Sequence, residues 1–377
     1  MVTVAQLVEP SIVVRLVVGS SPISHPKNSG CSVVRLAHVL WEHGVAGSNP
    51  ATPTLSMNNI FKIFFLSLFI IQCSSDVSVE DILTNNNSNN NGEFNGGGNQ
   101  TIPELSVELI STYNNQTASF ATPFGGFNRS FIVHTPPNFN YATESLPLLF
   151  VLHGYTGRAS LIRQYSGFDQ IADQERFIVV YVQGTTDIFG NTGWNVDVVP
   201  SFNNVDDVGF FQALIKYFTT TYNVDSAKIF SSGMSFGGFM SYRLACELNE
   251  INSIGSVTGS MAGYYQCNPP KKTSVIHFHG MEDAIVPYNG AEWSYSAEAA
   301  HSFWKNHNQC NSQTETTIPD FNGDGQYVRH LVSSNCEANK NVELYSLEGE
   351  GHTWLSKEWG HDINASELLW QFFQKQE

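Results

Sequence analysis

The sequence has few charged residues, and positively charged ones are the scarcest. Lys and Arg number 18 against 34 Asp and Glu in 377 residues, which gives a formal net charge of −16. Without a Lys- or Arg-rich run, nucleic acid is not an expected partner, because phosphate binding needs a clustered basic surface. Low charge with many Asn, Ser, Gly and Phe fits an extracytoplasmic protein, where the six cysteines could form disulfides.

The first 56 residues are unlike the rest of the chain, being rich in Val and nearly free of acidic residues. Gly19 to Pro22 and Gly47 to Pro50 read Gly-Ser-Ser-Pro and Gly-Ser-Asn-Pro, as T-arm sequences of tRNA genes do when translated in one frame. Their offset, 47 − 19 = 28 codons, is close to one tRNA gene plus a short spacer. We interpret residues 1–56 as a spurious extension of the gene. A short genuine extension is the alternative, and either one stays outside the fold.

Residues 57–73 have the pattern of an export signal. Lys62 precedes the apolar run Ile63 to Ile71, which is too short to span a bilayer as a mature helix. Ile70 to Cys73 resembles a bacterial lipobox, in which Cys73 would be lipidated, although Gln72 replaces the usual small residue. The segment therefore predicts either a surface lipoprotein, attached to the membrane only through that anchor, or plain secretion.

Residues 74–100 form a linker, because the Asn- and Gly-rich stretch Asn85 to Gln100 cannot bury apolar surface. One domain, residues 101–377, remains. Its cysteines allow two disulfides, whose pairing the sequence leaves open; they are Cys246, Cys267, Cys310 and Cys336. Asp320 to Gly325 has the first half of a calcium loop, but Leu331 stands where a bidentate Glu is required. We expect a turn there and no metal.

From Ser130 onward, apolar runs of strand length alternate with amphipathic helical patterns. The expected strands are Leu148 to Leu152, Phe177 to Val182, Lys228 to Ser232, Ile254 to Thr258, Ser274 to His279 and Val342 to Leu347. The amphipathic patterns predict helices near these ranges: Leu161 to Gln174, Asp207 to Tyr222, Phe236 to Leu248, Ala291 to His307 and Asn364 to Lys375. Near-continuous apolar strands between helices indicate a sheet buried on both faces. The sequence therefore predicts an α/β fold with a mostly parallel central sheet.

Within this alternation, Gly233-Met-Ser235-Phe-Gly237 lies between an expected strand and an expected helix. A sharp strand-to-helix turn strains the central residue, and glycine two residues before and after it best avoids a steric clash. The helix that follows would point its N-terminal dipole at a developing oxyanion. This context predicts that Ser235 is an exposed nucleophile, whereas the pentapeptide alone is a weak signal.

A serine nucleophile needs a histidine base and a carboxylate that orients it, each following a strand in the order Ser, acid, His. Glu282 and Asp283 follow one strand, and Asp283 is preferred because its shorter side chain holds an imidazole more rigidly. His352 follows the last strand. It is preferred over His361, which stands at the entrance to the last helix.

The loop after the first central strand should supply one oxyanion donor. We assign the backbone N–H groups of Tyr155 and Phe236 to this role, and expect His153 to be a packed histidine that supports the loop. Trp194 and Trp354 lie beside motif positions, so we expect their rings to bind substrate; core packing is the alternative.

These motifs together resemble the esterase family that groups polyhydroxybutyrate depolymerases with feruloyl and acetylxylan esterases, carbohydrate esterase family 1. The resemblance spans about Phe131 to Trp354. It is carried by LLFVLHGYTG, Gly193-Trp194-Asn195, Val205 to Phe210, Gly-Met-Ser-Phe-Gly-Gly, HFHGMEDAIVPY and Gly351-His352-Thr353-Trp354.

The resemblance implies an α/β-hydrolase fold, a three-layer sandwich, and a secreted or surface-anchored hydrolase of carboxylic esters that needs no cofactor. Its nucleophile, acid and base fall on Ser235, Asp283 and His352, and its disulfide pattern suggests Cys310 with Cys336. Tyr155 departs from the Cys or small residue common in relatives. The expected partner is a polymeric ester, with polysaccharide-linked or aryl esters ranked above polyhydroxybutyrate. A secreted serine peptidase and a noncatalytic surface-binding module are the alternatives from other classes.

Overall fold

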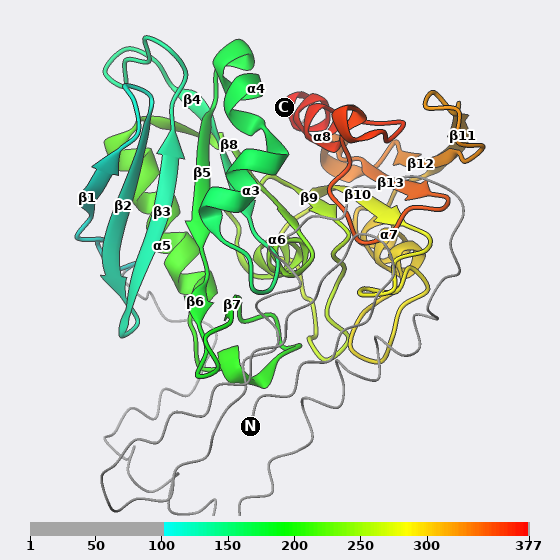
Figure 1. The fold of residues 1–377 in the computed structure, drawn as a ribbon, viewed down its shortest axis with the longest axis horizontal. Coiled ribbons are helices and arrows are strands. Elements are labelled where there is room, and N and C mark those ends of the chain that lie inside the picture. The colour runs from blue at the N-terminus through cyan, green and yellow to red at the C-terminus, as the bar shows by residue number, and fades with distance from the viewer. Residues whose placement is uncertain (1–101, 376–377) are drawn as a thin grey trace, which may run out of the picture. The chain divides into compact units, whose positions relative to one another are not determined.

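A single large sheet organises the part of the chain that the structure, a computed structural model, describes, namely residues 102–375. They belong to one compact unit, Gly97–Glu377. The sheet has 11 strands in the order β1-β2-β3-β5-β4-β8-β9-β10-β13-β12-β11 (Figure 1). The predictions for Cys73 and for residues 1–56, 57–73 and 74–100 concern residues outside the part of the chain that the structure describes. No helix among residues 102–375 is long and apolar enough to cross a membrane.

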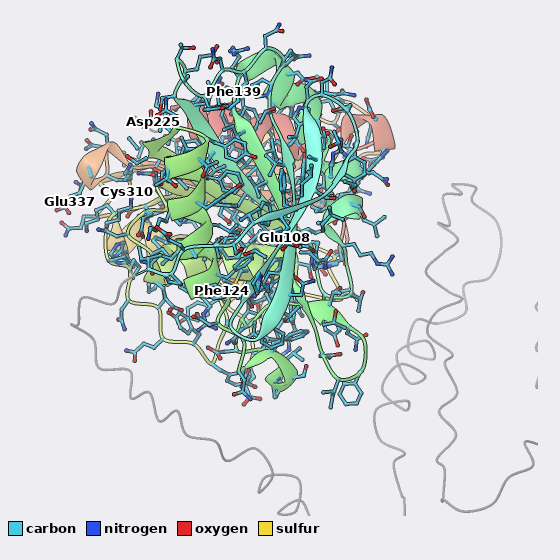
Figure 2. The ribbon with its side chains drawn as sticks, turned by 90° about the vertical axis from the view of Figure 1, so that its left-hand side faces the viewer. Glu108, Phe124, Phe139, Asp225, Cys310 and Glu337 are labelled. Carbon is cyan, nitrogen blue, oxygen red and sulfur yellow. A yellow bond between two sulfur atoms is a disulfide. The ribbon has the colours of Figure 1, made fainter. Side chains whose placement is uncertain are left out.

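The six central strands are parallel to one another. They are β5 (Ile178–Gln183), β4 (Leu146–Leu152), β8 (Val224–Met234), β9 (Ser253–Val257), β10 (Ser274–Gly280) and β13 (Val342–Leu347). All six were expected from their apolar runs. Antiparallel strands extend both edges: β1 (Glu108–Thr112), β2 (Thr117–Phe124) and β3 (Phe127–His134) on one side, β12 (Val328–Ser334) and β11 (Ser312–Ile318) on the other. Figure 2 looks onto the β1 edge, where Glu108 lies.

Helices cover both faces of the sheet, so successive residues of a central strand enter different cores. In β4, Phe150 packs in one core and Leu149 in the other. The core around Phe150 includes residues of α5 (Asp207–Thr221), α6 (Phe236–Glu247) and α7 (Ala297–His307). The core around Leu149 includes residues of α3 (Ala159–Ser166), α4 (Phe168–Glu175) and α8 (Ala365–Gln374). This three-layer arrangement is the α/β-hydrolase fold, and the prediction of the fold class is confirmed.

Two helices differ from the expectation for local reasons. The helix expected over 161–174 is two helices, because Gly167 between them has a left-handed backbone with φ 65°. The helix expected from Ala291 begins at Ala297, where the Ser296 hydroxyl accepts a hydrogen bond from Ala299 N–H and caps it. A two-stranded ribbon, β6 (Thr185–Thr186) with β7 (Thr192–Gly193), and the short 3₁₀ turns Pro200–Phe202, Glu337–Asn339 and Lys357–Trp359 complete the fold.

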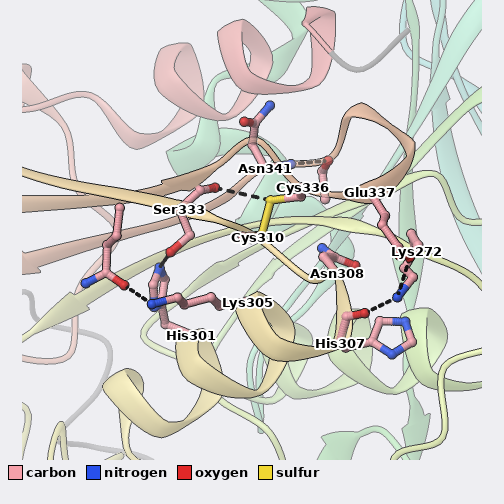
Figure 3. Close-up of a disulfide and its surroundings, with 12 residues drawn as sticks. Lys272, His301, Lys305, His307, Asn308, Cys310, Ser333, Cys336, Glu337 and Asn341 are labelled. Carbon is pink, nitrogen blue, oxygen red and sulfur yellow. Dashed lines mark hydrogen bonds and ion pairs between the residues drawn. A yellow bond between two sulfur atoms is a disulfide. The ribbon is translucent and has the colours of Figure 1, made fainter.

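Both disulfides join ends of elements. Cys246, at the end of α6, is bonded to Cys267 after β9. Cys310 and Cys336 are bonded across the base of the β11–β12 hairpin, close to the end of α7 (Figure 3). No strand was expected in the segment between this pair. It instead adds two strands to the sheet, and the predicted turn at 320–325 lies at the tip of the hairpin.

One buried ion pair ties the antiparallel strand β3 to the helix α5. Arg129 on β3 donates to Asp207 at the start of α5 over 2.6 Å, and both side chains are at most 1% exposed. The other oxygen of Asp207 accepts from the backbone N–H of Asn195 over 2.7 Å. The guanidinium carbon of Arg129 also lies 4.2 Å from the centre of the Phe210 ring.

Replacing Arg129 should therefore destabilise the fold strongly. Arg129→Met leaves a buried carboxylate without its partner, which costs about 3–5 kcal/mol. Arg329→Met is the matched control, because that arginine pairs with Glu315 where both side chains are partly exposed, and its loss should cost under about 1 kcal/mol. Urea unfolding of both variants measures the difference. Equal losses would contradict the structural role of the Arg129 pair.

Candidate active site

Ser235 lies between β8 and α6 in a backbone conformation that few residues adopt. Its φ is 54° and its ψ is −121°. The flanking glycines leave no room for side chains: a Cβ on Gly237 would lie 2.1 Å from Leu152 O, and one on Gly233 would lie 2.4 Å from the carbonyl carbon of Gly237. The sharp turn predicted from the Gly-x-Ser-x-Gly spacing is therefore present.

Asp283 lies in the loop after β10 and is buried, whereas its neighbour Glu282 is exposed. Its Oδ1 accepts hydrogen bonds from the backbone N–H groups of Ile285 at 2.8 Å and Val286 at 2.9 Å. Its Oδ2 lies 2.8 Å from Nδ1 of His352. Of the two carboxylates considered from the sequence, Asp283 is the one that contacts a histidine from a distant strand.

The environment of Asp283 keeps its carboxyl ionised. Burial opposes the charged form, but hydrogen bonds from His279 and His352 outweigh it and hold the pKa of Asp283 well below its usual range. An ionised carboxylate can only accept, so Nδ1 of His352 carries the proton in their hydrogen bond. In the neutral ring, Nε2 of His352 is then free to act as a base.

The loops that carry Asp283 and His352 are tied together by backbone contacts. Met281 N–H donates to Leu347 O over 2.8 Å, and Glu282 N–H donates to Glu350 O over 2.9 Å. The alternative base, His361, instead has Nδ1 2.9 Å from Ser356 O. Among the described residues, no hydrogen bond joins the Ser235 hydroxyl to the His352 ring. Catalytic hydrogen bonds are often long before substrate binds.

The loop after β4 is clamped by its own histidine. His153 donates from Nδ1 to Gly154 O over 2.7 Å and accepts at Nε2 from Gly184 N–H over 2.9 Å. Burial lowers the pKa of His153 to about 4, so the ring is neutral and its two bonds are compatible. The indole N–H of Trp194 donates to His153 O over 2.9 Å. His153 is thus a packed supporting residue, as expected.

This clamp leaves the Tyr155 N–H without a partner among the described residues, while the next two N–H groups, of Thr156 and Gly157, donate to Thr192 O and Gly154 O. A Cβ on Gly154 would lie 3.2 Å from the Cβ of Ser235, so the loop passes directly beside the serine.

The second N–H assigned from the sequence belongs to Phe236. It is the first residue of α6, where an N–H has no partner within its own helix. The rings of Tyr155 and Phe236 pack together with their centres 5.2 Å apart. The two N–H groups therefore belong to residues that are in contact with each other and close to Ser235.

The expectation that Trp194 and Trp354 present exposed rings to substrate is wrong. Trp194 is 0% exposed and Trp354 is 2% exposed. Trp354 donates from its indole N–H to the Ser366 hydroxyl over 3.0 Å and packs against Phe168. Both rings follow the core-packing alternative, since Trp194 lies in one of the two cores that flank the sheet and Trp354 in the other.

Within residues 102–375, no group of three or more His, Cys, Asp or Glu residues could hold a metal ion. The turn at 320–325 uses its carboxylates internally: Asp320 accepts from the backbone N–H groups of Gly323 and Gly325.

No family model matches the chain. It is 24% identical over 263 residues to a bifunctional acetylxylan esterase/xylanase of Neocallimastix patriciarum, covering 68% of this chain and 35% of that protein. It is 24% identical over 276 residues to feruloyl esterase D of Neurospora crassa, covering 70% of this chain and 86% of that enzyme. The chain is similar in sequence to feruloyl and acetylxylan esterases. It spans about a third of the length of the bifunctional relative. An acetyl xylan esterase from Aspergillus awamori matches in structure with a TM-score of 0.45 and 14% identity, over 72% of this chain and 99% of that one.

The hydrogen bond from the Trp194 indole to His153 O can be tested by mutation. Trp194→Phe keeps an aromatic ring but removes the hydrogen bond to His153 O, so the loop beside Ser235 should lose its fixed position. Ester hydrolysis should fall about tenfold in kcat, equivalent to about one hydrogen bond. Trp370→Phe is the control, since that buried indole N–H has no partner among the described residues. If both variants retain the same kcat, the clamp does not position the loop.

Proposed function

We propose that the protein is a serine hydrolase of carboxylic esters, with Ser235 as nucleophile, His352 as general base and Asp283 as the acid that orients it. The observation that carries the proposal is the 2.8 Å hydrogen bond between Asp283 and His352, which follow β10 and β13. Ser235 follows β8 in the same parallel sheet, so all three lie at the edge where the strands' carboxyl ends meet. The strained backbone of Ser235 supports its role as nucleophile.

The proposed reaction has two halves. His352 Nε2 takes the Ser235 proton as the hydroxyl oxygen attacks the ester carbonyl carbon, and the N–H groups of Tyr155 and Phe236 stabilise the resulting oxyanion. The intermediate collapses to an acyl-enzyme as His352 protonates the leaving alcohol. Water, deprotonated by His352, then attacks the acyl carbon and releases the acid with Ser235 restored. Asp283 stabilises the imidazolium in both halves.

Polysaccharide-linked or aryl esters are the proposed substrates, ahead of polyhydroxybutyrate. The names of the two relatives support this ranking. Exposed apolar side chains also follow the carboxyl ends of several parallel strands and could contact a large acyl group or polymer; they are Tyr155, Ile188, Phe189, Tyr264, Met281 and Ile285. The two disulfides fit an oxidising, extracytoplasmic site of action, and attachment through Cys73 stays part of the proposal.

Ser235→Ala should lower kcat for ester hydrolysis at least about a thousandfold, because no other group takes the place of the attacking oxygen. The purified wild-type protein should also react with a fluorophosphonate probe, and the variant should not. The probe separates an enzyme from a binding module. Retention of wild-type hydrolysis by Ser235→Ala would refute the proposal.

A substrate panel tests the ranking. Methyl ferulate and acetylated xylan should be hydrolysed with a higher kcat/KM than short-chain polyhydroxybutyrate, and a peptide anilide should be a poor substrate. Faster turnover of the polyester would reverse the ranking while leaving the triad assignment intact. Preference for the peptide anilide would place the protein among peptidases.

A further inference from the structure

A line of buried polar side chains runs from the core to the candidate acid. The Tyr242 hydroxyl on α6 lies 3.0 Å from Nδ1 of His277, and Nε2 of His277 lies 2.9 Å from Nδ1 of His279 on the same strand. Nε2 of His279 lies 2.8 Å from Val286 O and 3.4 Å from Asp283 Oδ2. Tyr242, His277 and His279 are all at most 1% exposed. So many polar groups are costly to bury unless each has a partner.

The carbonyl at the end of this line determines the direction of its hydrogen bonds. Val286 O can only accept, so Nε2 of His279 carries a proton and donates it. With one proton on each ring, Nδ1 of His279 then accepts from Nε2–H of His277, and Nδ1 of His277 accepts from the Tyr242 hydroxyl. Burial holds the pKa of His277 well below its ordinary value, so the His277 ring is neutral and carries one proton.

The line ends on the carboxylate oxygen that His352 also contacts. Asp283 Oδ2 therefore faces two imidazoles, His352 from the loop after β13 at 2.8 Å and His279 from β10 at 3.4 Å. Its Oδ1 is held by two backbone N–H groups. The carboxylate has no freedom to rotate without breaking one of these contacts.

We propose that Tyr242, His277 and His279 are positioning residues, a directed hydrogen-bond chain that holds the Asp283 carboxylate in place for His352. The inference rests on the proposed function and adds to it residues that touch no substrate. It also has an electrostatic consequence. The His279 Nε2–H, donated to Val286 O, also lies close to Asp283 Oδ2, and its partial positive charge offsets part of the negative charge that Asp283 offers to the His352 imidazolium.

Other titratable groups face this chain and must be considered in a pH experiment. His301 on α7 lies near His277, and its Nε2 is 3.3 Å from the Ser333 hydroxyl. The Tyr288 ring packs against His279 with centres 5.8 Å apart, while its hydroxyl lies 2.7 Å from that of Ser346. Neither side chain is altered by the variants below.

The first test compares two replacements of His279. His279→Leu removes the imidazole that donates to Val286 O and lies 3.4 Å from Asp283 Oδ2, so kcat should fall about tenfold or more, with KM nearly unchanged. The acid limb of the kcat/KM against pH profile should move to higher pH, because Asp283 then gives more of its charge to the His352 imidazolium. His279→Gln retains one donor and one acceptor and should recover most of the activity and the wild-type limb.

The second test acts at the far end of the chain with a conservative change. Tyr242→Phe removes only a hydroxyl and should lower kcat about threefold, the effect of a single neutral hydrogen bond. Tyr181→Phe is the matched control, because that buried hydroxyl donates to Asp169 over 2.7 Å outside the chain. It should lose stability but keep the wild-type kcat.

Two results would overturn the positioning role. In the first, His279→Gln loses as much kcat as His279→Leu, and the acid limb of the pH profile does not move in either variant. In the second, Tyr242→Phe has the same kcat as Tyr181→Phe. In either case Ser235→Ala, measured in parallel, shows whether only the positioning role fails or the proposed function fails as well. If Ser235→Ala remains inactive, only the chain is wrong; if it is active, the proposed function itself fails.

Discussion

The backbone of Ser235 is the constraint on which the rest of the site depends. A φ of 54° with a ψ of −121° costs of order 1–3 kcal/mol for a residue with a side chain, so packing must impose it. It is imposed where α6 presses against the end of β4, which leaves space only for hydrogen at Gly233 and Gly237. The same contact brings the loop after β4 beside Ser235, whose next residue, Phe236, supplies the first N–H of α6. Nucleophile and proposed oxyanion donors are thus consequences of one tight junction.

Two buried hydrogen-bonded systems reach this junction from different parts of the fold. One starts at the Arg129–Asp207 ion pair, passes through the backbone at Asn195 beside Trp194, and ends at His153 O in the loop after β4. The other is the Tyr242, His277 and His279 chain, which ends at Asp283. Each system holds a loop that follows a strand in a fixed position. The cost of burying these polar groups is offset because nearly every donor in them has an acceptor.

The central fold was predictable because each buried parallel strand contains a short apolar run, and the chain order of Ser235, Asp283 and His352 follows from the strands that precede them. The edge strands were not, because β11 is exposed almost throughout and β1 entirely, so neither carries an apolar run. The burial of Trp194 and Trp354 could not be predicted from the sequence, since a Trp beside a motif gives the same pattern whether its ring faces the substrate or the core. The chain behind Asp283 depends on contacts between α6 and β10 that no spacing reveals.

The central claim is that Ser235 is acylated during turnover, and an activated aryl acetate tests it most directly. The protein is mixed with p-nitrophenyl acetate in a stopped-flow instrument, and the release of nitrophenol gives the number of acyl groups transferred per protein. Quenching in acid and peptide mapping by mass spectrometry then identify the acetylated residue. The account predicts a burst of about one nitrophenol per protein, with the acetyl group on Ser235. An acetyl group on another residue, with Ser235 unmodified throughout the burst, would contradict it.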